Sequence, residues 1–265
     1  LSSENPNAAS VSETLLGHLE RVPPPSLHVV TLGKFEVRQG TRTILDQAWR
    51  QRRAGELFRL LLISPSRSLF RDQVAEALWP EKSPGSTPAL FHKATSALRH
   101  ALEPDLQDRF PSRYLTVEDK RATLHLPPGS WVDFAAFERH VRAEEWEAAL
   151  ALYQGELFPA DRYAGWTVVQ RERLTQDYVR AAVAAAQQWF AGGRFEEVLL
   201  IGRGVLVLEP WQEEAVLLGM RACVALNDRA GALRLYLDLE RRLDDALGIA
   251  PQEHVQQFYQ SLIQE

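Results

Sequence analysis

The chain has 265 residues, of which 45% are hydrophobic and 25% charged, and its formal net charge is -5. This composition is typical of a globular protein of one or two domains and excludes collagen-like, disordered and mucin-like classes. No apolar run approaches the roughly 18 residues that span a bilayer, and no signal-peptide pattern stands at the start.

Residues 1–26 are polar and end in Pro23-Pro24-Pro25, which predicts a flexible tail or linker. Because the chain begins with Leu and contains one Met, we expect it to be part of a longer parent protein. Residues 27–127 carry 16 basic and 11 acidic side chains, whereas residues 128–265 carry 13 and 21. This change of charge indicates two modules, of which the first is the candidate for binding a polyanion.

In the first module, the pattern predicts three short strands, then three helices, then a hairpin. The strands are His28–Leu32, Lys34–Arg38 and Arg42–Leu45; the helices are Arg52–Ile63, Arg71–Trp79 and Pro88–Leu102; the hairpin joins Tyr114–Val117 to Thr123–Leu126. Pro127-Pro128-Gly129 then marks the end of an α+β domain over residues 27–127.

The second module, residues 130–265, has the apolar spacing of helices almost throughout. The expected helices are Glu144–Tyr153, Thr175–Ala191, Phe195–Leu208, Gln212–Leu226 and Arg229–Leu247. A 34-residue step from Leu199 to Leu233 is typical of tetratricopeptide repeats, with an irregular helical bundle as the alternative. The single cysteine, Cys223, excludes an intramolecular disulfide and suits a reducing cytoplasm.

Motifs of enzymes and metal sites are absent from the sequence. It contains no P-loop, GxSxG, HExxH or EF-hand pattern. Its seven histidines do not have the spacing of metal ligands, since His92 and His100 on one predicted helix are eight residues apart. We therefore expect no enzyme activity, no metal and no cofactor.

The segment from Lys82 to Leu102 contains 21 residues and no acid. Thr87 and Pro88 predict a helix start, with Thr87 as the N-cap. One face of the helix is apolar, and the other carries hydrogen-bond donors: His92, Lys93, Ser96, Arg99 and His100. Such a helix suits reading the major groove of DNA. A solvated amphipathic helix is the alternative, although a solvated face usually mixes both signs of charge.

Two further groups of basic residues suit contacts to DNA phosphates. Arg50, Arg52 and Arg53 lie at the N-terminal end of a predicted helix, where the helix dipole disfavours cations. A phosphate would compensate them; the alternative is neutralisation by Asp46 or Glu56. The hairpin turn Glu118-Asp119-Lys120-Arg121 is either a wing that probes an adjacent groove or an ordinary solvated turn.

These features together resemble the SARP/AfsR family of bacterial transcriptional activators. In the first module, the resemblance rests on Leu32-Gly33-Lys34-Phe35-Glu36-Val37, the Arg-rich first helix, Ala77-Leu78-Trp79-Pro80 and Ser96-Ala97-Leu98-Arg99-His100-Ala101-Leu102, which are similar to an OmpR-type winged helix. In the second, it rests on Tyr153-Gln154-Gly155-Glu156-Leu157-Phe158-Pro159, Trp166 with Arg171-Glu172-Arg173-Leu174, Glu209-Pro210 with Glu213 or Glu214, Met220, Tyr236 and Leu247-Gly248-Ile249-Ala250-Pro251.

The resemblance implies an α+β winged-helix domain followed by an all-α, tetratricopeptide-like bacterial transcriptional activator domain. It implies a four-stranded N-terminal sheet, a recognition helix at Pro88–Leu102, a wing at Thr116–Leu124 and an activating loop before the recognition helix. DNA contacts are then expected from Thr87, Arg71, Lys120 and Arg121 besides the residues above, and polymerase contacts from Glu81, Lys82 and Ser83. The sequence departs from the family at Ala97, where an Arg is frequent, and at Phe70, where a Ser is usual.

We therefore predict a cytoplasmic, sequence-specific DNA-binding transcriptional activator. Its expected partners are double-stranded DNA, RNA polymerase, an upstream sensor or ATPase domain of the parent chain, and a second copy on repeated sites; no membrane is expected. The alternative is a protein-interaction or sensor module whose winged helix serves as a scaffold. Salt-dependent binding to DNA distinguishes the two.

Overall fold

The computed structural model describes residues 23–107 and 110–264, apart from the side chain of Arg52. Most of the predicted tail therefore lies outside the described residues. The described residues form two compact units. The first comprises the chain up to Val132 together with Ala160–Val168, and the second comprises Asp133–Pro159 and the chain from Val169 onward. The first unit thus takes in a short segment from beyond the boundary that the sequence suggests.

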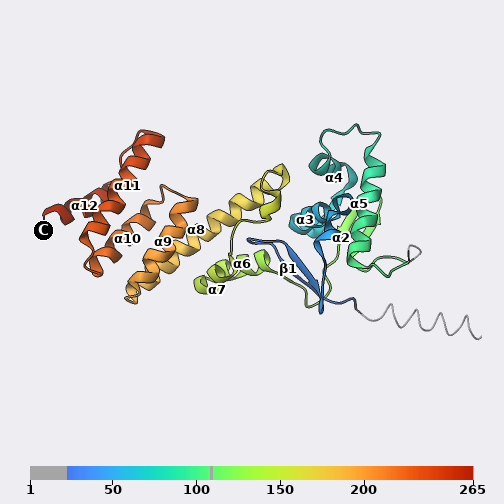
Figure 1. The fold of residues 1–265 in the computed structure, drawn as a ribbon, viewed down its shortest axis with the longest axis horizontal. Coiled ribbons are helices and arrows are strands. Elements are labelled where there is room, and N and C mark those ends of the chain that lie inside the picture. The colour runs from blue at the N-terminus through green and yellow to red at the C-terminus, as the bar shows by residue number, and fades with distance from the viewer. Residues whose placement is uncertain (1–22, 108–109, 265) are drawn as a thin grey trace, which may run out of the picture. The chain divides into compact units, whose positions relative to one another are not determined.

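The first unit begins with a four-stranded sheet in the order β3-β2-β1-β7 (Figure 1). Its strands are β1 (Leu27–Val30), β2 (Glu36–Gln39), β3 (Arg42–Thr43) and β7 (Trp131–Val132). β1 and β2 pair antiparallel, with Val29 opposite Val37 and both valines fully buried. β7 pairs with β1 in parallel. The four-stranded N-terminal sheet is confirmed, and its fourth strand comes from a much later part of the chain.

The next helices are α2 (Asp46–Arg50), α3 (Ala54–Ile63), α4 (Arg71–Leu78) and α5 (Thr87–Leu102). The expected continuous helix from Arg52 is wrong at its start, because Arg53 has a left-handed φ of 62° and separates α3 from the short helix α2. The expected N-cap role of Thr87 is also wrong. Ser86 occupies that position, while Thr87 is buried and its hydroxyl donates to the carbonyl oxygen of Ser83 at 3.3 Å.

A three-stranded sheet in the order β4-β6-β5 forms the wing. Its strands are β4 (Ser68–Phe70), β5 (Leu115–Glu118) and β6 (Arg121–Leu124). Asp119 and Lys120 form the turn between β5 and β6 with φ of 47° and 63°, as in the two-residue turns that match the twist of a hairpin. The predicted wing at Thr116–Leu124 is confirmed. β4, which no sequence pattern predicted, anchors the hairpin on its open edge.

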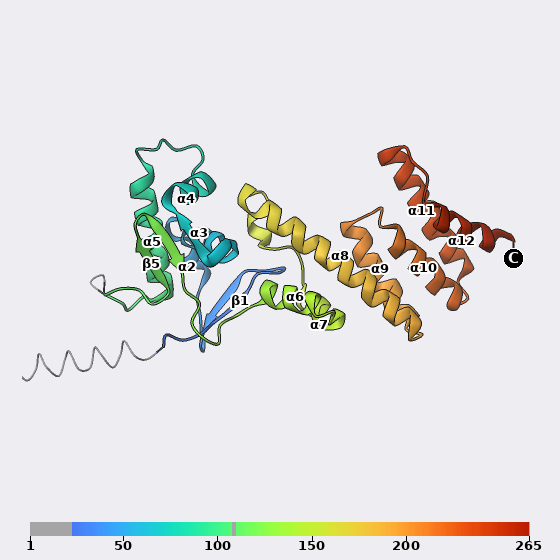
Figure 2. The ribbon, with the colours of Figure 1, turned by 180° about the vertical axis from the view of Figure 1, so that it is seen from behind.

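The second unit is built from helices that follow one another along a stack (Figure 2). They are α6 (Asp133–Arg142), α7 (Trp146–Leu152), α8 (Val168–Ala191), α9 (Phe195–Leu208), α10 (Glu213–Ala225), α11 (Arg229–Leu247) and α12 (Glu253–Gln264). α9 and α11 have the predicted bounds, and α8 begins two turns before the predicted Thr175. α10 packs against both α9 and α11. An α+β winged-helix unit followed by a tetratricopeptide-like helical unit is the predicted fold class, which is confirmed.

Candidate nucleic-acid interface

Helix α5 divides into a buried and an exposed face. The buried side chains are Phe91, Ala94, Thr95, Ala97, Leu98, Ala101 and Leu102. Their spacing of three and four residues places them on the side that packs against α3 and α4. The predicted apolar stripe is therefore confirmed. The side chain at position 97 lies in the core here. Having Ala97 where the resembling family often has Arg therefore takes away no surface contact.

The exposed face of α5 has two rows of donors. His92, Ser96 and Arg99 line a hollow of about 650 Å³. Thr116 and Glu118 of the wing strand β5 line its other side. Lys93 and His100 are exposed on α5 outside this hollow. The structure thus brings His92, Ser96 and Arg99 together beside the wing, whereas Lys93 and His100 lie on α5 outside the hollow.

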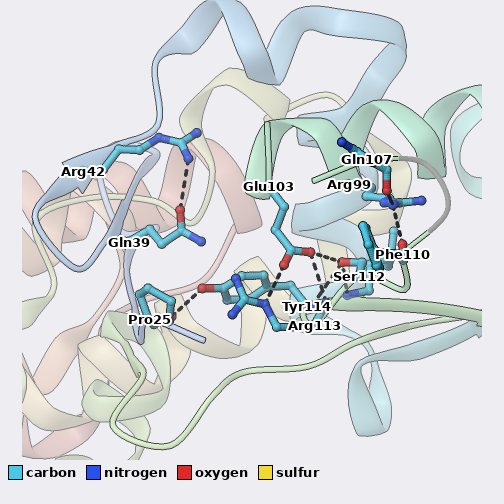
Figure 3. A network of polar contacts seen from close by, with 11 residues as sticks. Pro25, Gln39, Arg42, Arg99, Glu103, Gln107, Phe110, Ser112, Arg113 and Tyr114 are labelled. Atoms are coloured by element: carbon cyan, nitrogen blue, oxygen red, sulfur yellow. Dashed lines mark hydrogen bonds and ion pairs between the residues drawn. The ribbon is translucent and has the colours of Figure 1, made fainter. Parts of the chain in front are cut away.

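The guanidinium of Arg99 donates to two backbone carbonyl oxygens of the loop after α5 (Figure 3). One acceptor is Gln107, at 2.6 Å, and the other is Phe110. Directly after the end of α5, the buried carboxylate of Glu103 accepts from the hydroxyl of Ser112 and from both the backbone N–H and the Nε of Arg113. Arg99 and Glu103 therefore hold the two ends of the segment that leads into β5.

The C-terminal end of α5 is also attached to the N-terminal sheet, and Figure 3 shows Tyr114 bonded to Pro25 just before β1. Arg42 donates to the carbonyl oxygen of Ala101 at 3.0 Å, and the hydroxyl of Tyr114 donates to the carbonyl oxygen of Pro25 at 2.7 Å. Burial raises the pKa of Tyr114, so its phenol remains a donor at neutral pH. These bonds fix the end of α5 and the residue before β5 relative to the start of the unit.

The arginines before α3 have partners within the chain. Arg50 lies 3.9 Å from Asp46, and Arg53 donates to Glu56 at 3.1 Å and to the carbonyl oxygen of Leu78. Burial raises the pKa of Glu56 even though Arg53 lies beside it. Asp46 and Glu56 thus pair with Arg50 and Arg53, as the alternative expects, although the Arg50 pair is long and exposed. The side chain of Arg52 is not among those that the structure describes.

The wing is tied to the start of α4. The backbone N–H of Arg71 donates to the carbonyl oxygen of Lys120 at 2.6 Å, and the Arg71 side chain donates to Asp72 at 3.1 Å. The guanidinium of Arg121 lies 4.1 Å above the ring of Phe70, which is 46% exposed. Phe70, at the position where the resembling family has a cap serine, therefore supports a wing arginine, a role that sequence reasoning missed.

The loop between α4 and α5 is exposed from Glu81 to Ser86. The backbone N–H of Lys82 donates to Trp79, and that of Ser86 donates to Ser83, both at 3.0 Å. These turns confirm that the segment does not continue either helix. Glu81, Lys82 and Ser83 therefore share one exposed loop beside the start of α5.

Metal ligands and membrane-spanning helices are both lacking in the described part of the chain. No group of three or more His, Cys, Asp or Glu side chains among residues 23–107 and 110–264 is placed to hold a metal ion. None of the helices that the structure describes has both the length and the apolar character needed to cross a membrane.

Comparison with known proteins supports the architecture. Residues 132–263 match the model of the bacterial transcriptional activator domain family. The structure of Mycobacterium tuberculosis EmbR in complex with a low affinity phosphopeptide is similar in fold, with a TM-score of 0.69 and 21% sequence identity. The match covers 92% of this chain and 66% of that one, so the chain spans only part of that protein. No curated protein matches the sequence.

The domain match covers the helical unit, and the shared fold extends over the winged-helix unit as well. The residues quoted for the sequence resemblance lie in both units, in the same order along the chain. Residues 132–263 therefore form a bacterial transcriptional activator domain, and this domain and the shared fold support the resemblance to SARP-type bacterial transcriptional activators.

Proposed function

We propose that the protein is a sequence-specific DNA-binding activator that docks α5 on promoter DNA in the bacterial cytoplasm and contacts RNA polymerase. The observation that supports this best is the exposed face of α5. His92, Lys93 and His100 present donors there, and no acidic residue of α5 opposes them. The major groove of B-DNA admits one helix and offers acceptors on base edges to such donors.

The hollow between α5 and the wing suits the DNA backbone. It provides His92 and Ser96 on the helix side as hydrogen-bond donors, whereas the hydroxyl of Thr116 on the wing side is already hydrogen-bonded to His125 at 2.9 Å. Contacts from such groups to phosphate oxygens fix the orientation of a protein on the duplex without reading its sequence. Lys120 and Arg121 at the wing tip add positive charge beyond the hollow. The wing and α5 thus form one continuous surface for DNA.

The basic residues differ in how firmly their partners within the chain hold them, and their proposed roles follow from this difference. Arg50 and Asp46 are more than 80% exposed, and such a pair contributes only about 0–1 kcal/mol, so a phosphate can replace the carboxylate. Arg53 also holds the carbonyl of Leu78 and is therefore a structural residue first. We propose Arg50, Arg52 and Arg71 as phosphate contacts, and Lys93 and His100 as base contacts. Thr87 is buried, and the proposal assigns it no contact.

One observation favours the alternative function, in which the winged helix is a scaffold for protein interactions. Arg53 and Arg99, which the sequence offers as DNA contacts, direct their guanidinium groups at carbonyl oxygens of their own unit. A domain that had lost DNA binding would keep such structural arginines. The acid-free face of α5 would then have no function in such a domain. Under this alternative, Lys93 has no role.

Binding measured against salt concentration distinguishes these functions. DNA sites are first selected from a random-sequence pool, and affinity is then measured by fluorescence anisotropy at several salt concentrations. Lys93→Ala is expected to cost about 1–3 kcal/mol and to relax the preference at one base, if the contact is bidentate. Lys34→Ala is the matched control, because Lys34 is an exposed lysine of the same unit that pairs with Glu36 at 2.8 Å.

The wild-type chain should bind the selected sites with a steep, linear loss of affinity on a plot of log Kd against log salt. Lys34→Ala should leave both affinity and preference unchanged. Absence of salt-dependent binding by the wild-type chain would overturn the DNA-binding function and leave the scaffold. Equal effects of Lys93→Ala and Lys34→Ala would remove α5 as the reading element.

A further inference from the structure

One row of side chains crosses all three strands of the wing sheet. Arg121 on the middle strand β6 lies opposite Phe70 of β4 on one side and opposite Glu118 of β5 on the other. Directly opposite residues of antiparallel strands project their side chains to the same face of the sheet, within reach of each other. Arg121 therefore has two competing neighbours, an aromatic ring and a carboxylate.

The guanidinium of Arg121 takes the aromatic neighbour. It lies 4.1 Å from the centroid of the Phe70 ring, and no ion pair joins it to Glu118. A cation over an exposed aromatic ring and a pair of opposite charges across two strands stabilise a protein by similar amounts. Phe70, which is 46% exposed, thus competes with Glu118 for Arg121 on nearly equal terms.

The carboxylate of Glu118 lies where it affects the proposed DNA interface. Glu118 is exposed, and it lines the hollow between α5 and the wing. It has no ion-pair partner among the residues that the structure describes. If Arg121 turned to Glu118, the two charges would cancel, and the wing would lose one cation for DNA phosphates. Such cations supply most of the affinity of proteins for DNA of any sequence.

We propose that Phe70 is a positioning residue that keeps Arg121 away from Glu118 and available to a DNA phosphate. The inference rests on the proposed function, in which the wing contacts DNA. An aromatic ring, unlike a carboxylate, holds a guanidinium without cancelling its charge. The serine that is usual at this position in the resembling family has no ring, so the device belongs to this chain.

The first test needs no DNA. The ring current of Phe70 shifts the proton NMR signals of the Arg121 δ-methylene upfield when the two side chains are in contact. We expect this shift in the wild-type chain and in Glu118→Gln, and its loss in Phe70→Leu. The cap of α4 survives Phe70→Leu, because it uses the backbone N–H of residue 70, which donates to Gln73 at 2.9 Å. An unshifted δ-methylene in the wild-type chain would overturn the positioning role.

The second test is a double-mutant cycle in which DNA affinity is measured by fluorescence anisotropy. Phe70→Leu should weaken binding to the selected sites about fivefold and lower the slope of log Kd against log salt by up to about one, because one phosphate contact is lost. Phe70→Leu should change almost nothing in the Glu118→Gln background, since Arg121 then has no carboxylate to pair with. Phe70→Tyr keeps a ring and should bind DNA like the wild type.

The matched control is Tyr163→Leu. Tyr163 belongs to the same unit, lies outside the wing and has the guanidinium of Arg162 5.4 Å from its ring centroid. This variant removes the same kind of contact and should leave DNA affinity unchanged. Unchanged thermal unfolding shows that each variant is folded. Equal losses of affinity in Phe70→Leu and Tyr163→Leu would overturn the proposal, as would equal losses from Phe70→Leu in the wild-type and Glu118→Gln backgrounds.

Failure of this inference is distinguishable from failure of the proposed function. If the wild-type chain binds DNA and Phe70→Leu binds it equally well, the DNA-binding function stands and the positioning role is overturned. If the wild-type chain shows the upfield shift but no salt-dependent binding to DNA, the DNA-binding function is overturned, and the role of Phe70 in it falls as well.

Discussion

Within α5, Arg99 lies between the recognition helix and the loop that leads into the wing, and its donors are directed at the carbonyl oxygens of Gln107 and Phe110. Glu103 holds the far end of the same loop through Ser112 and Arg113. An arginine in this state supports the interface by setting the distance between α5 and β5. It does so without contacting a base. Under the proposed function, Lys93, six residues earlier on the exposed face, contacts a base.

Arg99→Ala and Lys93→Ala are therefore expected to differ in kind. Arg99→Ala removes hydrogen bonds from a charged group, so the free energy of unfolding should fall by about 1.5–3 kcal/mol. Its DNA affinity should also fall, but the slope of log Kd against log salt should stay unchanged because the number of phosphates bound stays the same. Lys93→Ala should leave chemical denaturation unchanged.

Urea denaturation and salt-dependent anisotropy of both variants check this difference. Arg99→Lys is the informative second variant, because a lysine of similar length keeps the charge and loses the fork that reaches two carbonyls. If Arg99 contacts a phosphate, Arg99→Lys should preserve DNA affinity. If Arg99 positions the loop, Arg99→Lys should be almost as weak as Arg99→Ala.

At the scale of elements, the short segment Ala160–Val168 belongs to the winged-helix unit although it follows α7 in the chain. Arg59 on α3 holds its Asp161 with two bonds, of 2.5 and 3.1 Å, and both side chains are only 11% exposed. The guanidinium of Arg59 also lies 4.7 Å over the ring of Phe35. Thr167 bonds back to the carbonyl of Asp161 and closes the segment on itself. The segment acts as a strap that completes the core around α3.

Asp161→Ala should strongly destabilise the first unit. Removing one partner of a buried ion pair leaves the other charge uncompensated, which costs about 3–5 kcal/mol. Asp177→Ala is the matched control, because the exposed pair of Asp177 with Arg180 contributes only about 0.2–1 kcal/mol. Urea denaturation of the two variants gives the comparison. Similar losses for both would show that the strap is not part of the core of the winged-helix unit.

At the scale of the whole molecule, the proposed function predicts that DNA binding and polymerase contact can be separated by mutation. We expect Glu81→Ala combined with Lys82→Ala to bind selected DNA sites with unchanged affinity and to lose stimulation of transcription. The physical reason is that both side chains are exposed on a loop outside α5, so they are accessible without contributing to its packing. In vitro transcription with purified polymerase and anisotropy on the same DNA measure the two properties. Normal stimulation of transcription by the double variant would exclude this loop as the polymerase contact and leave the helical unit as the candidate.

Local sequence was sufficient for the buried face of α5 and for most of the longer helices, although it missed α6 and α12. The bounds of α9 and α11 followed from apolar spacing and from turn residues such as Asn227 and Asp228, since the period of a helix is local. Short elements were missed or misplaced: β4, β7 and α2 have too few residues to show a period. The left-handed Arg53 that ends the preceding turn also leaves no pattern in the sequence.

The sequence by itself determined which face of α5 is free of acids and how charge divides between the modules, because both depend only on composition and spacing. The tertiary structure decided which basic residues face solvent. Arg99 meets a carbonyl 11 residues later, Arg53 one 25 residues later, and Arg59 a carboxylate 102 residues later. Partners that far apart are brought together only when the core closes. The sequence therefore does not distinguish a hydrogen-bond donor that is accessible to DNA from one that bonds within its own fold.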